Sequence, residues 1–283
     1  FHLGRGRALS LFDKVIIVDW SGGNDRGASP KKDAIWACVA GESPVYLRNR
    51  TLAEDWIGTQ IAACQGRVLI GFDFPFGYPD GFAEAVTGQA DPLALWAWFE
   101  ARVEDSPKAN NRFDLAGELN RHFAGVGPFW GNALAREIVD LPRKGRSRYG
   151  HGMREKRAAE AQAKGAFACW QMSGAGSVGG QTMMGLPVLA RLRARFDAAA
   201  WPFEPWREAR VVLAEVWPSL IAQSVVRQQA EGEIKDAAQV RVLAGKIAGL
   251  SDAVLAAMLD VTEPRALTEG WILGLGREAD LDC

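Results

Sequence analysis

Short, strongly apolar runs along the chain predict the strands of a sheet. The clearest runs are 14–20, 67–74 and 210–216, where apolar residues follow one another without alternation. Such runs are typical of strands that are buried on both faces of a parallel layer. Two further runs, 34–40 and one that begins at Val45, are joined by a short turn and predict an antiparallel meander with the first run.

Apolar positions at spacings of three and four residues predict helices between and after these strands. The first helix follows Thr51, a good N-cap residue, and ends near 65–66. A short strand is predicted at 167–170, and a glycine-rich loop at 173–182 is expected before a helix at 187–196. The other predicted helices are 92–103, 113–122, 132–139, 154–164, 219–229, 235–248, 252–259 and 264–275.

Strands that alternate with helices indicate the α/β class, with a sheet flanked by helices. We expect a single domain over 11–283, interrupted by a large and mostly helical insertion or cap at about 80–209. The segment 1–10 is interpreted as a flexible terminus or a tag remnant. A length of 283 residues allows one domain of this size.

Composition excludes several classes of protein. The chain has no apolar run of about eighteen residues, so no membrane span and no membrane partner are predicted. Its four cysteines include no C-x-x-C pair and it has only three histidines, which argues against a zinc enzyme. Free thiols fit a reducing, cytoplasmic setting. The net charge of −1 does not make the whole molecule attractive to polyanions.

Acidic residues stand where the predicted sheet would bring them together. Asp19, Asp73 and Glu215 each directly follow an apolar run, and Asp236 begins a predicted helix. A carboxylate at the end of a buried strand is costly unless it is paired, hydrogen-bonded or bound to a cation. Because open α/β sheets bind ligands at the carboxyl ends of their strands, these acids predict a site.

The chemistry that suits such a cluster is phosphodiester hydrolysis with divalent cations. Two cations can supply a nucleophilic water and stabilise the leaving oxygen, and Mg²⁺ or Mn²⁺ prefers oxygen ligands. We therefore predict Asp19, Asp73, Glu215 and Asp236 as both catalytic and metal-binding. Local roles stay open as the alternative: Asp19 capping its loop, Asp73 starting a turn, Glu215 marking a bend and Asp236 stabilising a helix N-terminus.

Three segments are candidates for contact with a phosphate. The loop 21–32 is polar and glycine-rich, the segment 143–157 is strongly basic, and 174–182 holds four glycines that permit closely spaced amides. A plain turn, a solvated loop and a tight packing connection are the respective alternatives. The side chains predicted to contact substrate are Ser21, Lys31, Arg146, Arg148, Ser177, Gln181 and Thr182.

Several segments together resemble a bacterial domain-of-unknown-function family of predicted nucleases with an RNase H-like fold. The segments are "VIIVDW", "VLIGFDFPFGYP", "VVLAEVWPS", "KDAAQVRVLAGKI" and the glycine-rich "GAGSVGGQTMMGLP". The positions that match the family pattern are Asp19, Asp73 with Pro75, Gly77 and Pro79, Glu215 with Pro218, and Asp236.

The resemblance implies a mixed five-stranded sheet in which strands one to three are antiparallel and strands one, four and five are parallel. It also implies two-metal catalysis. The chain departs from RNase H itself, because its second carboxylate follows the fourth strand and does not lie on the first helix. That arrangement is closer to Holliday-junction resolvases.

The function predicted from the sequence is a metal-dependent nuclease or phosphodiesterase that acts on nucleic acid. Two alternatives stay open. One is a nucleotide- or phosphometabolite-binding protein, for example in cofactor metabolism, and the other is a non-catalytic RNase H-like module. The sequence leaves the choice between DNA, RNA and nucleotide open, as well as that between a monomer and a dimer.

Overall fold

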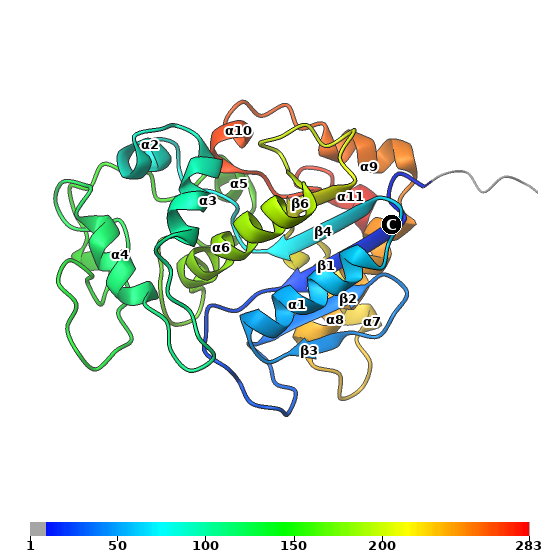
Figure 1. The fold of residues 1–283 in the computed structure, drawn as a ribbon, viewed down its shortest axis with the longest axis horizontal. Coiled ribbons are helices and arrows are strands. Elements are labelled where there is room, and N and C mark those ends of the chain that lie inside the picture. Colours follow the sequence, from blue (N-terminus) through cyan, green and yellow to red (C-terminus); the bar gives the residue numbers. More distant parts are fainter. Residues whose placement is uncertain (1–9, 283) are drawn as a thin grey trace, which may run out of the picture.

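A mixed six-stranded sheet forms the centre of the protein in the computed structural model, which describes residues 10–282 (Figure 1). The segment 1–10 predicted as a flexible terminus lies, except for Ser10, outside the described residues. The strand order is β3-β2-β1-β4-β6-β5. The strands are β1 (Lys14–Asp19), β2 (Ile35–Val39), β3 (Val45–Leu47), β4 (Val68–Asp73), β5 (Ala199–Ala200) and β6 (Val211–Glu215).

The strand directions follow the predicted pattern. Strands β1, β2 and β3 pair antiparallel, whereas β4 pairs parallel with both β1 and β6. Five of the six strands that the sequence predicts are confirmed, and so is the α/β class. The sheet gains a sixth strand because the two-residue β5 pairs with the edge of β6. The predicted strand 167–170 does not form a ladder, and this region contributes only an isolated bridge between Trp130 and Gln171.

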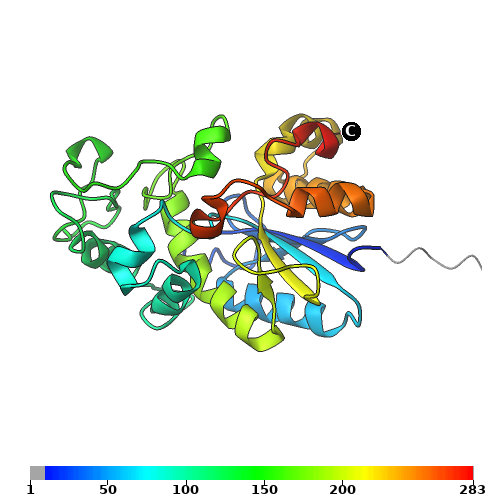
Figure 2. The ribbon, with the colours of Figure 1, turned by 90° about the horizontal axis from the view of Figure 1, so that it is seen from above.

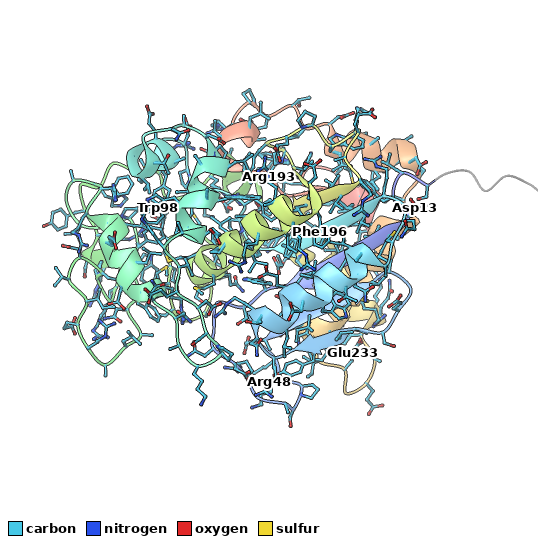
Figure 3. All side chains as sticks on the ribbon, in the orientation of Figure 1. Asp13, Arg48, Trp98, Arg193, Phe196 and Glu233 are labelled. Carbon is cyan, nitrogen blue, oxygen red and sulfur yellow. The ribbon has the colours of Figure 1, made fainter. Side chains whose placement is uncertain are left out.

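Helices cover both faces of the sheet (Figure 2). One face carries α1 (Arg50–Ala62) and α6 (Val178–Phe196), and the other carries α8 (Lys235–Gly249). Successive strand residues point to opposite faces, so Ile16 and Val18 pack on the α6 side while Val15 and Ile17 pack on the α8 side. The side chains fill the space between these layers (Figure 3).

The other described helices are mostly short. Among the helices of residues 10–282, no single one is long and apolar enough to cross a membrane; only α8 and α9 together, bent by 111°, reach that length and composition. The helices other than α1, α6 and α8 are α2 (Phe82–Thr87), α3 (Pro92–Glu100), α4 (Arg112–Asn120), α5 (Ala158–Gln162), α7 (Ala222–Gln228), α9 (Asp252–Leu259), α10 (Ala266–Glu269) and α11 (Glu278–Leu281), with short 3-10 turns η1 (Gly145–Ser147) and η2 (Pro218–Ile221).

Two predicted helices are wrong for identifiable reasons. The segment 132–139 is not helical, since the Asn132 side chain bonds the backbone of Leu134 and Arg136 and holds a local turn. The segment 264–275 forms only α10, because Gly270 and Gly274 adopt φ of +84° and +85°. The first helix begins two residues early: Asn49, and not Thr51, accepts the N-cap bond from Leu52.

Helix α6 begins nine residues before the predicted start at 187, so Pro187 lies inside it. Its glycines allow close packing. A Cβ on Gly185 would lie 2.3 Å from the Phe74 ring, and one on Gly179 would lie 2.6 Å from the carbonyl oxygen of Cys169. These glycines led the sequence analysis to predict a loop, because glycine also disfavours a helix. The glycine-rich loop therefore covers only 173–177.

The predicted insertion at 80–209 contains two kinds of structure. Helices α2, α3 and α4 and the long loops around them lie together on the side of the molecule toward which β1 and β4 point (Figure 1). By contrast, α6 packs against α1, α3 and β6, and β5 joins the sheet. Phe196, labelled in Figure 3, marks the end of α6 that is remote from the glycine-rich loop. The last part of the predicted insertion, which contains α6 and β5, thus belongs to the central layers of the domain.

Close packing at the middle of β4 gives a first test of this arrangement. A Cβ on Gly71 would lie 2.6 Å from a methyl group of Val216 and 2.7 Å from the Cδ1 of Ile17. We expect Gly71→Ala to lower the free energy of unfolding by about 1–3 kcal/mol through overpacking. As a control, Gly245→Ala on the open face of α8 meets no neighbour and should raise it by up to about 1 kcal/mol. Urea denaturation measures both variants. An unchanged free energy of unfolding in Gly71→Ala would contradict the close packing around Gly71.

Candidate functional site

Asp19 and Asp73 lie side by side at the ends of two neighbouring parallel strands. They are register partners in the pairing of β1 with β4, where adjacent strands are about 4.8 Å apart. Strand alternation places both carboxylates on the α8 face, with Ile17 and Leu69. Both side chains are half-buried, so they are partly dehydrated but still reachable. The predicted convergence of these two acids is therefore observed.

Asp236 approaches the same place from α8, whose first turn it occupies. This helix packs against β1 and β2, which positions its N-terminus near the end of β1. The Asp236 carboxylate accepts a hydrogen bond from the backbone N–H of Asp33 at 2.7 Å. Asp33 has a φ of +55° and ends the loop after β1. It adds a fourth carboxyl group that the sequence analysis did not identify.

Burial and the mutual repulsion of these acids raise their pKa values. Burial raises the pKa of Asp19 well above its ordinary value, and the charges of Asp73, Asp236 and Asp33 raise it further. Burial, then Glu215 and Asp236, raise the pKa of Asp73 to about 7. The pKa of Asp236 is also raised, chiefly by burial. A site that holds carboxylates against such repulsion is costly, and a bound cation would offset the cost.

Asp73 should make the stability of the metal-free protein depend on pH. Its pKa is 3.8 in an ordinary setting and about 7 when folded, so between these values the folded state keeps a proton that the unfolded chain releases. Stability is then full below pH 3.8 and is lost as pH rises to about 7. We expect Asp73→Asn to be more stable than the wild type at pH 8 by on the order of 1–3 kcal/mol, since one pKa unit is worth about 1.4 kcal/mol.

Urea unfolding between pH 4 and 8 in a chelator measures this effect. The exposed Asp55→Asn on α1 is the matched control and should leave the pH profile unchanged. Identical profiles for the wild type and Asp73→Asn would show that folding does not raise the pKa of Asp73.

Glu215 has different surroundings from the other three predicted acids. Strand alternation places it with Val211 and Leu213 on the α6 side of the sheet, opposite Asp19 and Asp73. It is 2% exposed, and its two carboxylate oxygens accept bonds from Arg157 at 2.8 and 2.5 Å. The backbone N–H of Phe76 donates a third bond at 2.9 Å. Glu215 is thus closed off by a buried ion pair and is not presented as an open ligand.

Arg157 is the centre of that buried network. It is 0% exposed and also pairs with Glu160 three residues later. Its guanidinium donates to the carbonyl oxygen of Glu269 at 2.8 Å, and the Glu269 carboxylate pairs with Arg154. The neighbouring carboxylates raise the pKa of Arg157 despite its burial, so it stays charged. The network connects α5, α10 and the end of β6.

A cleft of about 640 Å³ opens beside Asp19 and Asp236. A second cavity of about 220 Å³ holds Asp73 and Glu215, and the two cavities share Gly176 and Gln181. The cleft is lined by Asp19, Trp20, Ser21, Gly22, Gly23, Asp33, Ala34, Arg112, Met172, Ser173, Gly174, Ala175, Gly176, Ser177, Gly180, Gln181, Asp236 and Gln239.

Three of the seven predicted substrate-contacting side chains line this cleft. They are Ser21 after β1, Ser177 at the start of α6 and Gln181 in its first turn. The amide of Gln181 donates to the carbonyl oxygen of Trp20 at 2.8 Å and so connects the loop after β1 to α6. Thr182 is fully buried and bonds within the helix instead, and Lys31 is exposed outside the cleft lining.

The basic segment 143–157 is largely used for internal contacts. Arg148 pairs with Glu155 and donates to the carbonyl oxygen of Pro128. Arg143 donates hydrogen bonds to four carbonyl oxygens of the 132–136 turn, so its charge is used within the protein. Arg146 is exposed in η1. The structure does not bring Arg146 or Arg148 to the cleft.

The donor chemistry of Asp19, Asp73 and Asp236 suits a hard divalent cation, because all three offer carboxylate oxygens. Within residues 10–282, however, no group of three or more His, Cys, Asp or Glu side chains is arranged to hold a metal ion. Mg²⁺ commonly takes one or two carboxylates together with waters and substrate phosphates, so a complete protein cage is not required.

Comparisons with known proteins show no family for this chain. No family model matches the chain. No significant match was found among curated proteins or among solved structures.

Proposed function

We propose that the protein is a metal-dependent phosphodiesterase or nuclease built on an RNase H-like core. The strand order β3-β2-β1-β4-β6 and its strand directions agree with the order that the resemblance implies. The observation that carries the proposal is the pair Asp19 and Asp73, which are in register on adjacent parallel strands and have raised pKa values. Structural carboxylates are more often paired with a cation or a donor than with each other.

In this proposal, Asp19 and Asp73 bind the divalent cation and Asp236 completes the acidic side of the cleft. A divalent cation, Mg²⁺ or Mn²⁺, would supply an activated water and charge stabilisation for the leaving oxygen. Desolvation of Asp19 and Asp73 strengthens their attraction for a cation over that of carboxylates in water. Asp33 holds Asp236 in place through its backbone N–H.

Glu215 supports the site in this proposal and does not bind the cation. Its charge is one cause of the raised pKa of Asp73, so the two groups interact across the end of β4. Its ion pair with Arg157 and its bond from Phe76 fix the turn that follows Asp73. This turn contains Pro75, and the position of Asp73 depends on it.

A nuclease assay tests the proposal directly. Single-stranded, duplex and branched DNA and RNA are incubated with the protein in Mg²⁺ or Mn²⁺, beside Asp19→Asn and a chelator control. We expect cleavage of at least one substrate that is lost in the chelator and in Asp19→Asn. Absence of cleavage on every substrate, or cleavage that persists in Asp19→Asn, would refute the proposal.

The size of the cleft favours a second candidate function, binding of a free nucleotide or phosphometabolite. A volume of about 640 Å³ is within the range of small-molecule sites and suits one nucleotide more than a duplex. A ligand that binds only the folded state raises the apparent melting temperature. Stabilisation by a mononucleotide with no need for a divalent cation, and without cleavage of nucleic acid, would favour this function over the first.

A further inference from the structure

Two buried hydrogen-bond donors in the lining of the 640 Å³ cleft have no acceptor. Within residues 10–282, four buried side-chain polar atoms have no hydrogen-bond partner, and two of them are the Nε1 of Trp20 and the Nε of Arg112. Trp20 is 1% exposed. A buried N–H without a partner costs about 1–3 kcal/mol. The Trp20 ring packs in the core against Phe72 and Phe74. The unpaired Nε of Arg112 belongs to a side chain that is only partly buried, so it is the donor that an acceptor-rich ligand in the cleft could pair with.

Arg112 lies where such a ligand could reach it. A Cβ built on Gly180 would lie 3.7 Å from the Arg112 Nε, so the guanidinium is against the first turn of α6. Its Nη1 donates to the Asn110 side chain at 2.8 Å, and no ion pair involves it among the described residues. Asp105, the acid whose charge raises the pKa of Arg112, is bound to Arg50. Burial and the charge of Arg50 lower the pKa of Arg112 to about 10, as expected for a cation that lacks a counter-ion.

The glycine-rich loop 173–177 contributes backbone donors to the same part of the cleft. Gly174 and Gly176 adopt φ of +87° and +78°, and the hydrogen bonds of the described residues do not engage the amides of Ala175 and Gly176. Helix α6 begins directly afterwards and is 19 residues long, so its N-terminus adds a positive partial charge. Ser177 at its N-cap makes no side-chain cap bond, which leaves its hydroxyl available.

We propose that Arg112, the loop 173–177 and the start of α6 form a phosphate-binding subsite of the cleft. The inference rests on the proposed function in one respect: the cation at Asp19 and Asp73 lets a phosphate approach the carboxylates of the cleft. A phosphate has oxygens for both sides of the cleft, the donors on one side and the cation on the other. Arg112 positions the substrate phosphate, and the ligand class is a nucleotide or a nucleic acid strand that presents a phosphate.

Phosphate fits this subsite better than a neutral ligand does. Three carboxyl groups, those of Asp19, Asp33 and Asp236, line the cleft beside the donors. An anion bound by Arg112 alone would be repelled by them, whereas an anion that also binds Mg²⁺ would not. Charge-assisted hydrogen bonds from a guanidinium are strong and are typical of phosphate recognition.

Binding measurements on Arg112 variants test the subsite. Adenosine 5′-monophosphate, with adenosine as the phosphate-free control, is titrated into the wild type in Mg²⁺ by calorimetry. A fluorescent 12-nucleotide single strand is followed by anisotropy in parallel. We expect at least one of these phosphate ligands to bind, and Arg112→Gln to weaken that binding about 10- to 100-fold, as for a lost charge-assisted bond. The exposed Arg102→Gln is the matched control and should bind like the wild type.

Arg112→Lys keeps the charge but loses the planar fork, so an intermediate affinity is expected, and this variant replaces Arg112→Gln if the latter does not fold by circular dichroism. Unchanged affinity for both ligands in the Arg112 variants, binding of neither ligand, or adenosine binding as tightly as its monophosphate would overturn the subsite.

The outcomes separate this inference from the proposed function. Arg112-dependent binding of the monophosphate without cleavage of any nucleic acid would sustain the subsite and refute the nuclease. Cleavage that is lost in Asp73→Asn while Arg112→Gln keeps the wild-type KM would sustain the nuclease and refute the subsite. If both hold, Arg112→Gln should raise KM more than it lowers kcat.

Discussion

Replacement of Asp73 by Asn is expected to reduce divalent-cation-dependent cleavage of nucleic acid on the order of 100- to 1,000-fold. This is the magnitude for removal of one electrostatic group from a preorganised site. Asn keeps the size of the side chain but removes the charge that attracts the cation. Because Asp73 is the in-register partner of Asp19, the loss removes half of the carboxylate pair.

The stability measurement makes this prediction specific. A damaged fold would lose activity and stability together, whereas Asp73→Asn should lose activity while it gains stability at pH 8 in the absence of metal. Asp55→Asn, on the exposed face of α1, should change neither quantity. Retention of more than about a tenth of the wild-type rate in Asp73→Asn would place the chemistry elsewhere.

The second large effect concerns stability. We expect Arg157→Met to lower the free energy of unfolding by about 3–5 kcal/mol, because it leaves Glu160 and Glu215 buried without their partner. The methionine side chain fills part of the volume of the arginine side chain. The loss of unfolding free energy therefore comes mainly from the unpaired charges of the two glutamates. The change should also disturb the turn after Asp73, since Glu215 holds the backbone N–H of Phe76.

An exposed ion pair provides the matched control for Arg157. Arg191 pairs with Glu54 on the α6 and α1 side of the protein, and the Arg191 side chain is 43% exposed. Arg191→Met should cost less than about 1 kcal/mol, as exposed pairs usually do. Urea denaturation at pH 7 compares the two variants. Equal and small losses would show that the Arg157 network is neither buried nor structurally important.

The sequence predicted the parts of the fold that local pattern determines. Continuous apolar runs located the long strands, and the acids after the first and fourth runs identified Asp19 and Asp73. Asp236 was identified because it begins a predicted helix and matches the pattern of the family that the sequence resembles. The glycine-rich start of α6 was misread, since glycine promotes loops and close helix packing alike.

The part of the site that depends on distant contacts was not predictable. Strand alternation places Glu215 on the same face of β6 as Val211 and Leu213. The sequence does not show whether this face meets α6 or α8, because that depends on strand register and packing. Its partner Arg157 lies 58 residues earlier, in a segment whose basic character suggested substrate contact. Arg112 gave no signal, because it opens a short helix and its missing acceptor is visible only in three dimensions.

The most direct test of the central claim is to locate a cation. A crystal soaked in Mn²⁺ with adenosine 5′-monophosphate, measured near the manganese absorption edge, gives an anomalous difference map that shows where the metal binds. The account predicts a peak within bonding distance of carboxylate oxygens of Asp19 and Asp73, on the α8 side of the sheet. A map without density there, or with manganese only at surface carboxylates remote from the cleft, would contradict it.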